Sequence, residues 1–177
     1  VRFFAGHDYT PDLLASETMI EEAYAGGVTM GGELAKTSEA PRFVAWASAD
    51  PRGTALQRLQ IIKGWERGGE TYEQVYDVAC SDGLTPNPET NRCGDNGARV
   101  DISDCSITEG VGAAELKAVW QDPDYDADSR AFYYVRALEN PTCRWSTWDA
   151  IRAGVEPRPD LHTTLQERVW SSPIWVQ

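Results

Sequence analysis

The pattern most suggestive of metal chemistry is a run of alternating aspartates, Asp122, Asp124, Asp126 and Asp128. Carboxylates at alternate positions resemble the start of a calcium-binding loop. The rest of that pattern fails, because Ala127 stands where the loop needs glycine and Tyr133 stands where it needs glutamate. A turn whose aspartates hydrogen-bond their own backbone explains the run as well. We therefore treat these four aspartates only as a candidate calcium site and assign no other metal ligand.

Hydrolytic chemistry needs side chains that this sequence supplies sparsely. The two histidines, His7 and His162, are far apart and show neither H-x-H nor H-x-x-x-H spacing. A Ser-His-Asp triad built from distant residues stays open, although no G-x-S-x-G elbow marks a nucleophile. The pair Gly31-Gly32 lacks the Lys-Ser/Thr of a phosphate-binding loop and indicates a bulge or turn. We predict no catalytic residue in this chain.

The four cysteines, Cys80, Cys93, Cys105 and Cys143, form an even set without a C-x-x-C pair. Zinc sites need such close pairs, so two disulfides are the better interpretation. We predict Cys93–Cys105, which closes a short loop, and Cys80–Cys143, which requires the two strands that precede these cysteines to be neighbours. The rival pairing is Cys80–Cys93 with Cys105–Cys143. Disulfides persist in oxidising compartments, so we expect a periplasmic or secreted protein.

Seven tryptophans could pack in a core or form a sugar-binding platform. The positions 46, 65, 120, 170 and 175 fall within or at the ends of expected strands, which favours core packing. Trp145 and Trp148 follow the strongest strand and are the better candidates for exposure. A carbohydrate- or ligand-binding module would expose these two as a platform, with Trp65 as a further candidate.

Charge and length exclude several classes of protein. The chain has 177 residues and a net charge of −12, and its lysines and arginines form no cluster. Nucleic-acid partners and anionic membranes need a basic patch, so we expect neither. No apolar run approaches the roughly 20 residues that span a membrane. The length suits a single domain with a core of its own.

The strongest strand signal lies at 131–139, where aromatic and β-branched residues occupy both faces. Apolar residues on both faces are typical of a central strand. Segments 56–65 and 71–80 flank a Gly68-Gly69 turn and predict a hairpin. The remaining strands are expected at 1–4, 42–49, 113–121 and, at the end of the chain, 168–170 and 174–176.

Two short helices are expected between strands, at 16–25 and 147–153. Ser16 and Ser146 are suitable N-caps, and glycines follow both segments as stops. The polar connection at 81–112 is long, and we expect disulfide bonds from the cysteines within it to hold it in place. The pattern predicts a mainly β fold: an antiparallel β-sandwich of about eight strands with two short inserted helices, in one domain over 1–177.

Six segments in order resemble the C-terminal part of the bacterial domain-of-unknown-function 3604 family: 27–34, 60–65, 112–116, 130–136, 144–150 and 166–175. Members of that family resemble exported metallohydrolases of the PHP (polymerase and histidinol phosphatase) superfamily, related to the carbaryl-hydrolase group. In them an N-terminal PHP domain carries the metal-binding His and Asp, and those motifs have no counterpart here. The resemblance implies a non-catalytic accessory domain.

The resemblance also implies a partner, the N-terminal hydrolase domain of the same protein. Since the chain opens inside an expected strand at Val1–Phe4, we interpret it as the C-terminal fragment of a larger exported protein. We expect no cofactor in it, and divalent metal ions only in the missing domain. Candidates for docking on that domain, and for walling its cleft, are Met30, Glu33, Lys63, Glu66, Arg144, Trp145 and Glu167. The alternative is that these polar groups satisfy one another within the chain.

Overall fold

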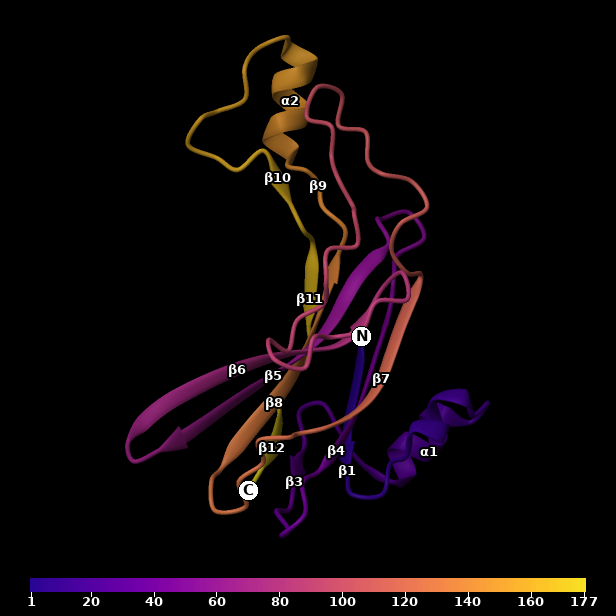
Figure 1. Ribbon diagram of the computed structural model, residues 1–177, viewed down its shortest axis with the longest axis vertical. Helices are drawn as coiled ribbons and strands as arrows, with labels where there is room; N and C mark the ends of the chain where they lie inside the picture. Colours follow the sequence, from indigo (N-terminus) through magenta and orange to yellow (C-terminus); the bar gives the residue numbers. More distant parts are fainter.

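Two β-sheets packed face to face form the body of the protein, and an arm extends from one end (Figure 1). The computed structural model describes all 177 residues. Six strands of five or more residues build the two sheets, and four strands of two or three residues complete them. Two further short strands pair with each other in a separate two-stranded sheet. The predicted mainly β sandwich with two α-helices is confirmed.

The smaller sheet has four antiparallel strands. In spatial order they are β2 (Gly27–Thr29), β1 (Arg2–Gly6), β4 (Arg42–Ser48) and β7 (Glu115–Gln121). Apolar residues occupy both faces of β1 and β4, because one face meets the other sheet and the other face meets a helix.

The larger sheet contains the predicted central strand and hairpin. Its order is β3 (Glu33–Leu34), β12 (Ile174–Val176), β8 (Ala131–Glu139), β5 (Leu56–Arg67) and β6 (Glu70–Cys80), with β11 (Arg168–Trp170) also pairing with β8. The β12–β3 pair is parallel, and the other pairs are antiparallel. β8 lies inside the sheet, and Gly68 and Gly69 make the β5–β6 turn with positive φ angles, as their lack of a side chain allows.

The core lies between the two sheets. Phe43 of β4 meets Tyr133 of β8 with ring centroids 4.4 Å apart. Phe3, Ile61 and Val135 are fully buried in the same cluster of 16 residues. Each such side chain contributes about 1.5–3 kcal/mol by its burial. This packing fixes how the loops and strand ends are placed.

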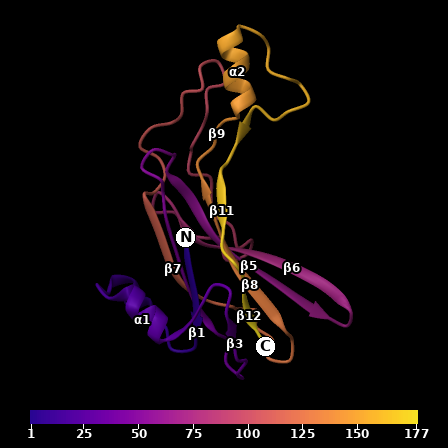
Figure 2. The same ribbon diagram turned by 180° about the vertical axis from the view of Figure 1, so that it is seen from behind.

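A helical layer covers the outer face of the smaller sheet (Figure 2). It consists of the 3-10 turn η1 (Pro11–Ala15) and the helix α1 (Met19–Ala25). The prediction of one helix over 16–25 is wrong at its start, because Thr18 occupies the N-cap. The Ser16 hydroxyl instead accepts a hydrogen bond from the Thr18 amide at 3.1 Å and donates one to Glu22.

The arm carries the second helix. It comprises β9 (Thr142–Cys143), α2 (Trp145–Ala153), β10 (Thr164–Leu165) and the loop residues 97–110 beside them (Figure 1). α2 begins two residues before its predicted start, with Arg144 as N-cap, so Ser146 lies inside the helix. Gly154 ends α2 in the left-handed conformation, as predicted. Neither helix has the length and apolar character needed to cross a membrane.

The disulfides join Cys80 to Cys93 and Cys105 to Cys143. Our pairing of Cys93–Cys105 with Cys80–Cys143 is therefore wrong, and the rival pairing is right. The error follows from strand order, because β5 lies between β6 and β8. The end of β6 is thus not adjacent to the segment after β8. The segment that contains Cys93 instead folds back along β6. The disulfide between Cys143 and Cys105 cross-links the arm.

Candidate functional site

A buried ion pair links the β5–β6 hairpin to the aspartate run. Lys63 and Asp122 are 4% and 3% exposed, and the Lys63 ammonium lies 2.6 Å from Asp122 Oδ2. The same ammonium donates to the Asp124 carbonyl at 2.7 Å. Burial, together with the Asp122 charge, raises the pKa of the Tyr133 hydroxyl, which donates to Asp122 at 2.7 Å. Lys63, one of our docking candidates, is therefore part of the core.

The aspartate run does not gather its carboxylates around one point. Asp122 binds Lys63, Asp124 accepts from the Tyr76 hydroxyl at 2.7 Å, and Asp126 pairs with Arg67 at 2.6 Å. The Arg67 hydrogen bond lowers the pKa of Asp126 to about 2. Asp122 and Asp126 each accept from the backbone N–H two residues on, which is the self-capping turn that we gave as the alternative.

No group of three or more His, Cys, Asp or Glu residues is arranged to hold a metal ion. The calcium candidate is thus not supported, because three of its four carboxylates have protein partners. His7 approaches the Ala35 carbonyl at 3.3 Å, and His162 is exposed in the arm, so the two histidines do not meet. Gly31 turns with a φ of 88° and donates to the Pro173 carbonyl, as a turn glycine does.

The seven docking candidates do not share one end of the molecule. Glu33 begins β3, Met30 lies just before it in the chain, and Glu66 lies near the hairpin turn. Arg144 and Trp145 begin α2, at the far end of the long axis (Figure 1). The remaining two are the buried Lys63 and the exposed Glu167, which precedes β11. The seven candidates therefore form no single surface, because the hairpin and the arm extend from the sandwich in different directions (Figure 1).

The arm exposes several apolar side chains to solvent. Its exposed members are Ile102, Ile107, Trp145, Trp148 and Val155. Trp145, at the start of α2, is 66% exposed. Trp148 is one turn further along the same helix face, with the Arg152 guanidinium 5.5 Å from its ring. The expected exposure of both tryptophans is confirmed, but Trp65 lies in the hairpin, so the three form no common platform.

A second group of aromatic residues, two exposed and two half-buried, lies where the hairpin meets β8 and β12. We call it the aromatic groove: a hollow of about 530 Å³ whose rings come from Trp65, Tyr72, Phe132 and Trp175. Trp65 and Tyr72 stack with centroids 5.5 Å apart, and Phe132 and Trp175 lie 5.1 Å apart. Core packing was expected for Trp175 and is wrong, because this side chain is 43% exposed on the sheet's outer face. Trp170, 52% exposed, departs from the expectation in the same way.

A glycine shapes the floor of the aromatic groove. Gly64 pairs with Phe132 across β5 and β8, and a β-carbon at this position would overlap the Phe132 ring. The missing side chain lets that ring lie flat on the strand. The sequence analysis did not predict the groove. The available signal was that Phe132 and Tyr134 lie at alternate positions of β8 and therefore point away from the core.

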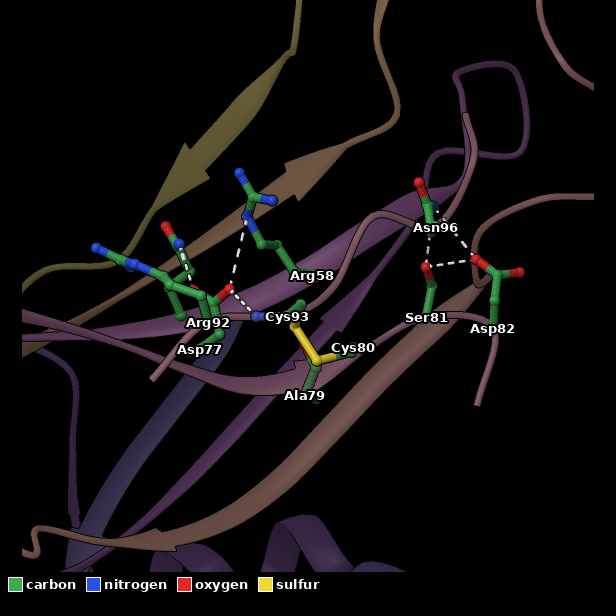
Figure 3. The surroundings of a disulfide bond; sticks show 10 residues. Arg58, Asp77, Ala79, Cys80, Ser81, Asp82, Arg92, Cys93 and Asn96 are labelled. Atoms are coloured by element: carbon green, nitrogen blue, oxygen red, sulfur yellow. Dashed lines mark hydrogen bonds and ion pairs between the residues drawn. A yellow bond between two sulfur atoms is a disulfide. The ribbon is translucent and has the colours of Figure 1, made fainter. Parts of the chain in front are cut away.

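A network around Asp77 also escaped sequence reasoning. Asp77 is buried on β6 and accepts from Gln60 at 2.6 Å and from the Cys93 amide at 2.8 Å. Arg58 and Arg92 flank the same carboxylate (Figure 3). These contacts fasten the long connection to β6 beside the Cys80–Cys93 disulfide, which is a structural role. The signal in the sequence was the charged residue Asp77 within an otherwise apolar stretch of β6.

The hydrogen bonds beyond that disulfide fix the start of the same connection. Asn96 donates to the Ser81 hydroxyl at 3.1 Å and to Asp82 at 3.2 Å (Figure 3). The Ser81 hydroxyl donates to Asp82 and lowers the pKa of that carboxyl. The long connection is therefore held by side chains as well as by cysteines.

Comparison with known proteins identifies the family. The sequence model of a family described as "Protein of unknown function (DUF3604)" matches residues 1–177. The chain belongs to the DUF3604 family. Neither the curated proteins nor the solved structures contain a match. Membership of DUF3604 confirms the family resemblance and assigns no reaction, so function must be argued from the arm and the aromatic groove.

Proposed function

We propose that this DUF3604 chain is the non-catalytic accessory domain of an exported, PHP-type metal-dependent hydrolase. In this proposal it is the C-terminal domain, and it docks on the catalytic domain and walls part of the substrate cleft. The hydrolase assignment comes from the resemblance of the six sequence segments. Divalent metal ions belong to the catalytic domain in this proposal.

One observation carries the docking proposal: the arm holds exposed tryptophans away from the sandwich. Trp145 is 66% exposed at the start of α2, with Trp148 beside it on the same face. Water-exposed apolar clusters mark interaction sites, and tryptophan is enriched among the residues that dominate binding energy. The Cys105–Cys143 disulfide restrains the arm before it meets a partner, which reduces the entropy cost of docking.

The proposed location follows from the cysteines. All four are paired, and none is free. Paired cysteines are typical of oxidising compartments, so we place the protein in the periplasm or outside the cell.

The docking proposal is tested by titrating this chain with the separately produced N-terminal domain in a calorimeter. Trp145→Ala should weaken association by about tenfold or more, since buried interface tryptophans contribute about 2 kcal/mol or more. Trp170→Ala is the matched control, because Trp170 is also an exposed tryptophan but lies on the sheet rather than the arm. Equal affinity for wild type, Trp145→Ala and Trp148→Ala would contradict docking through the arm.

The second candidate function is a carbohydrate- or ligand-binding module. The aromatic groove supports it, because it places four rings around one solvent-facing hollow. A single protein can use both surfaces, since the arm and the groove lie on different parts of the chain.

A further inference from the structure

We propose that the aromatic groove binds a neutral oligosaccharide. This inference concerns the hairpin end of the sandwich and does not depend on docking through the arm. It rests on three features of the groove: its exposed aromatic rings, a hydrogen-bond donor and an acceptor that have no partner in the chain, and its rigid walls.

The rings offer flat apolar surface to solvent. Tyr72 and Trp175 are 41% and 43% exposed, although each is in contact with another ring of the groove. Ligand sites combine such aromatic lining with a few polar groups that fix orientation. A pyranose ring has an apolar face of C–H bonds, and this face packs on an aromatic ring without loss of hydrogen bonds.

The rim supplies both an acceptor and a donor that nothing in the chain uses. Glu73 and Arg130 line the groove and are exposed, and their side chains make no hydrogen bond or ion pair within the chain. A carboxylate accepts hydrogen bonds from hydroxyls, and a guanidinium donates to hydroxyl oxygens. A sugar hydroxyl can do both, so a polyhydroxylated ligand uses both groups. An organic cation would be attracted to Glu73 and to Glu66, which also lines the groove, and would be repelled by Arg130.

The walls are held in place before any ligand arrives. The Lys63 ammonium lies 5.1 Å from the centroid of the Trp65 ring, and this ammonium is itself fixed by Asp122. Phe132 lies against Gly64 and Trp175. The rings are therefore already ordered, so binding a ligand costs little conformational entropy in their side chains. Because the rings come from four strands of one sheet, the groove suits several linked sugar units.

The test is a titration of the chain with cellohexaose, xylohexaose, mannohexaose and chitohexaose, followed by tryptophan fluorescence and calorimetry. We expect saturable binding of at least one hexasaccharide. Trp175→Ala should weaken that binding about tenfold or more, as loss of a stacking ring typically does. Trp170→Ala is the matched control, since Trp170 lies on the same face of the larger sheet outside the groove, and it should bind within about twofold of wild type. Glu73→Gln and Arg130→Gln should each weaken binding without changing the unfolding midpoint.

Three results would overturn the proposal. The first is that no hexasaccharide binds the wild-type chain. The second is that Trp175→Ala binds as the wild type does. The third is that phenyltrimethylammonium binds more tightly than every hexasaccharide and is lost in Glu73→Gln, which would assign the groove to organic cations. None of these experiments measures association through Trp145. A negative result would therefore not contradict the docking proposal, which is tested separately.

Discussion

Removing Asp122 should destabilise the fold far more than removing a surface carboxylate. Lys63 is 4% exposed, and Asp122 Oδ2 is both its ion-pair partner at 2.6 Å and the acceptor of the Tyr133 hydroxyl. Asp122→Ala leaves a buried ammonium whose one remaining hydrogen bond is to the Asp124 carbonyl. Breaking a buried pair in this way costs about 3–5 kcal/mol. Urea denaturation of wild type and variant measures this loss.

The same pair provides a control within a double-mutant cycle. Lys63→Met removes the ammonium and leaves Asp122 buried with its hydrogen bonds from Tyr133 and the Asp124 amide. The variant that carries both changes should lose less stability than the sum of the single variants, with a coupling of about 1–3 kcal/mol. Additive losses, or a loss below about 1 kcal/mol for Asp122→Ala, would refute the assigned role of the pair.

Three further predictions follow from particular contacts. Gly64→Ala should cost about 1–3 kcal/mol in urea unfolding, because the added methyl group overlaps the Phe132 ring, and an unchanged midpoint would contradict that packing. Cys143→Ser, made together with its partner cysteine, should cost about 2–4 kcal/mol and speed proteolysis within the arm, whereas protease resistance equal to wild type would contradict the staple. The pKa of Asp126, about 2 because of the Arg67 hydrogen bond, should move toward 3.8 in Arg67→Gln when followed by NMR. Since the folded pKa is lowered, the stabilising contribution of this carboxyl is present above about pH 4 and is lost as pH falls toward 2.

Much of the sheet structure was predictable from local pattern. Segment 131–139 is apolar on both faces, and it became the inner strand β8. The hairpin formed where Gly68 and Gly69 separate two strand patterns. These features depend on neighbours in the sequence, which the sequence displays directly.

The disulfide pairing and the buried lysine depended on relations between distant segments. The Cys80–Cys143 prediction required β6 and β8 to be adjacent, and nothing local shows that β5 separates them. Lys63 looked like a surface residue, because its partner Asp122 lies in a different part of the chain. Trp170 and Trp175 looked like core residues, since strand pattern alone does not say which face of a sheet stays uncovered.

The central claim, that the arm docks on a catalytic domain, is tested most directly by hydrogen exchange of α2 in two settings. Exchange at Trp145–Ala153 would be compared between this chain alone and the full-length protein, with β8 as an internal reference. Docking predicts slower exchange in α2 of the full-length protein and unchanged exchange in β8, because covering the arm suppresses its local opening. Identical exchange of α2 in the two settings would contradict the claim.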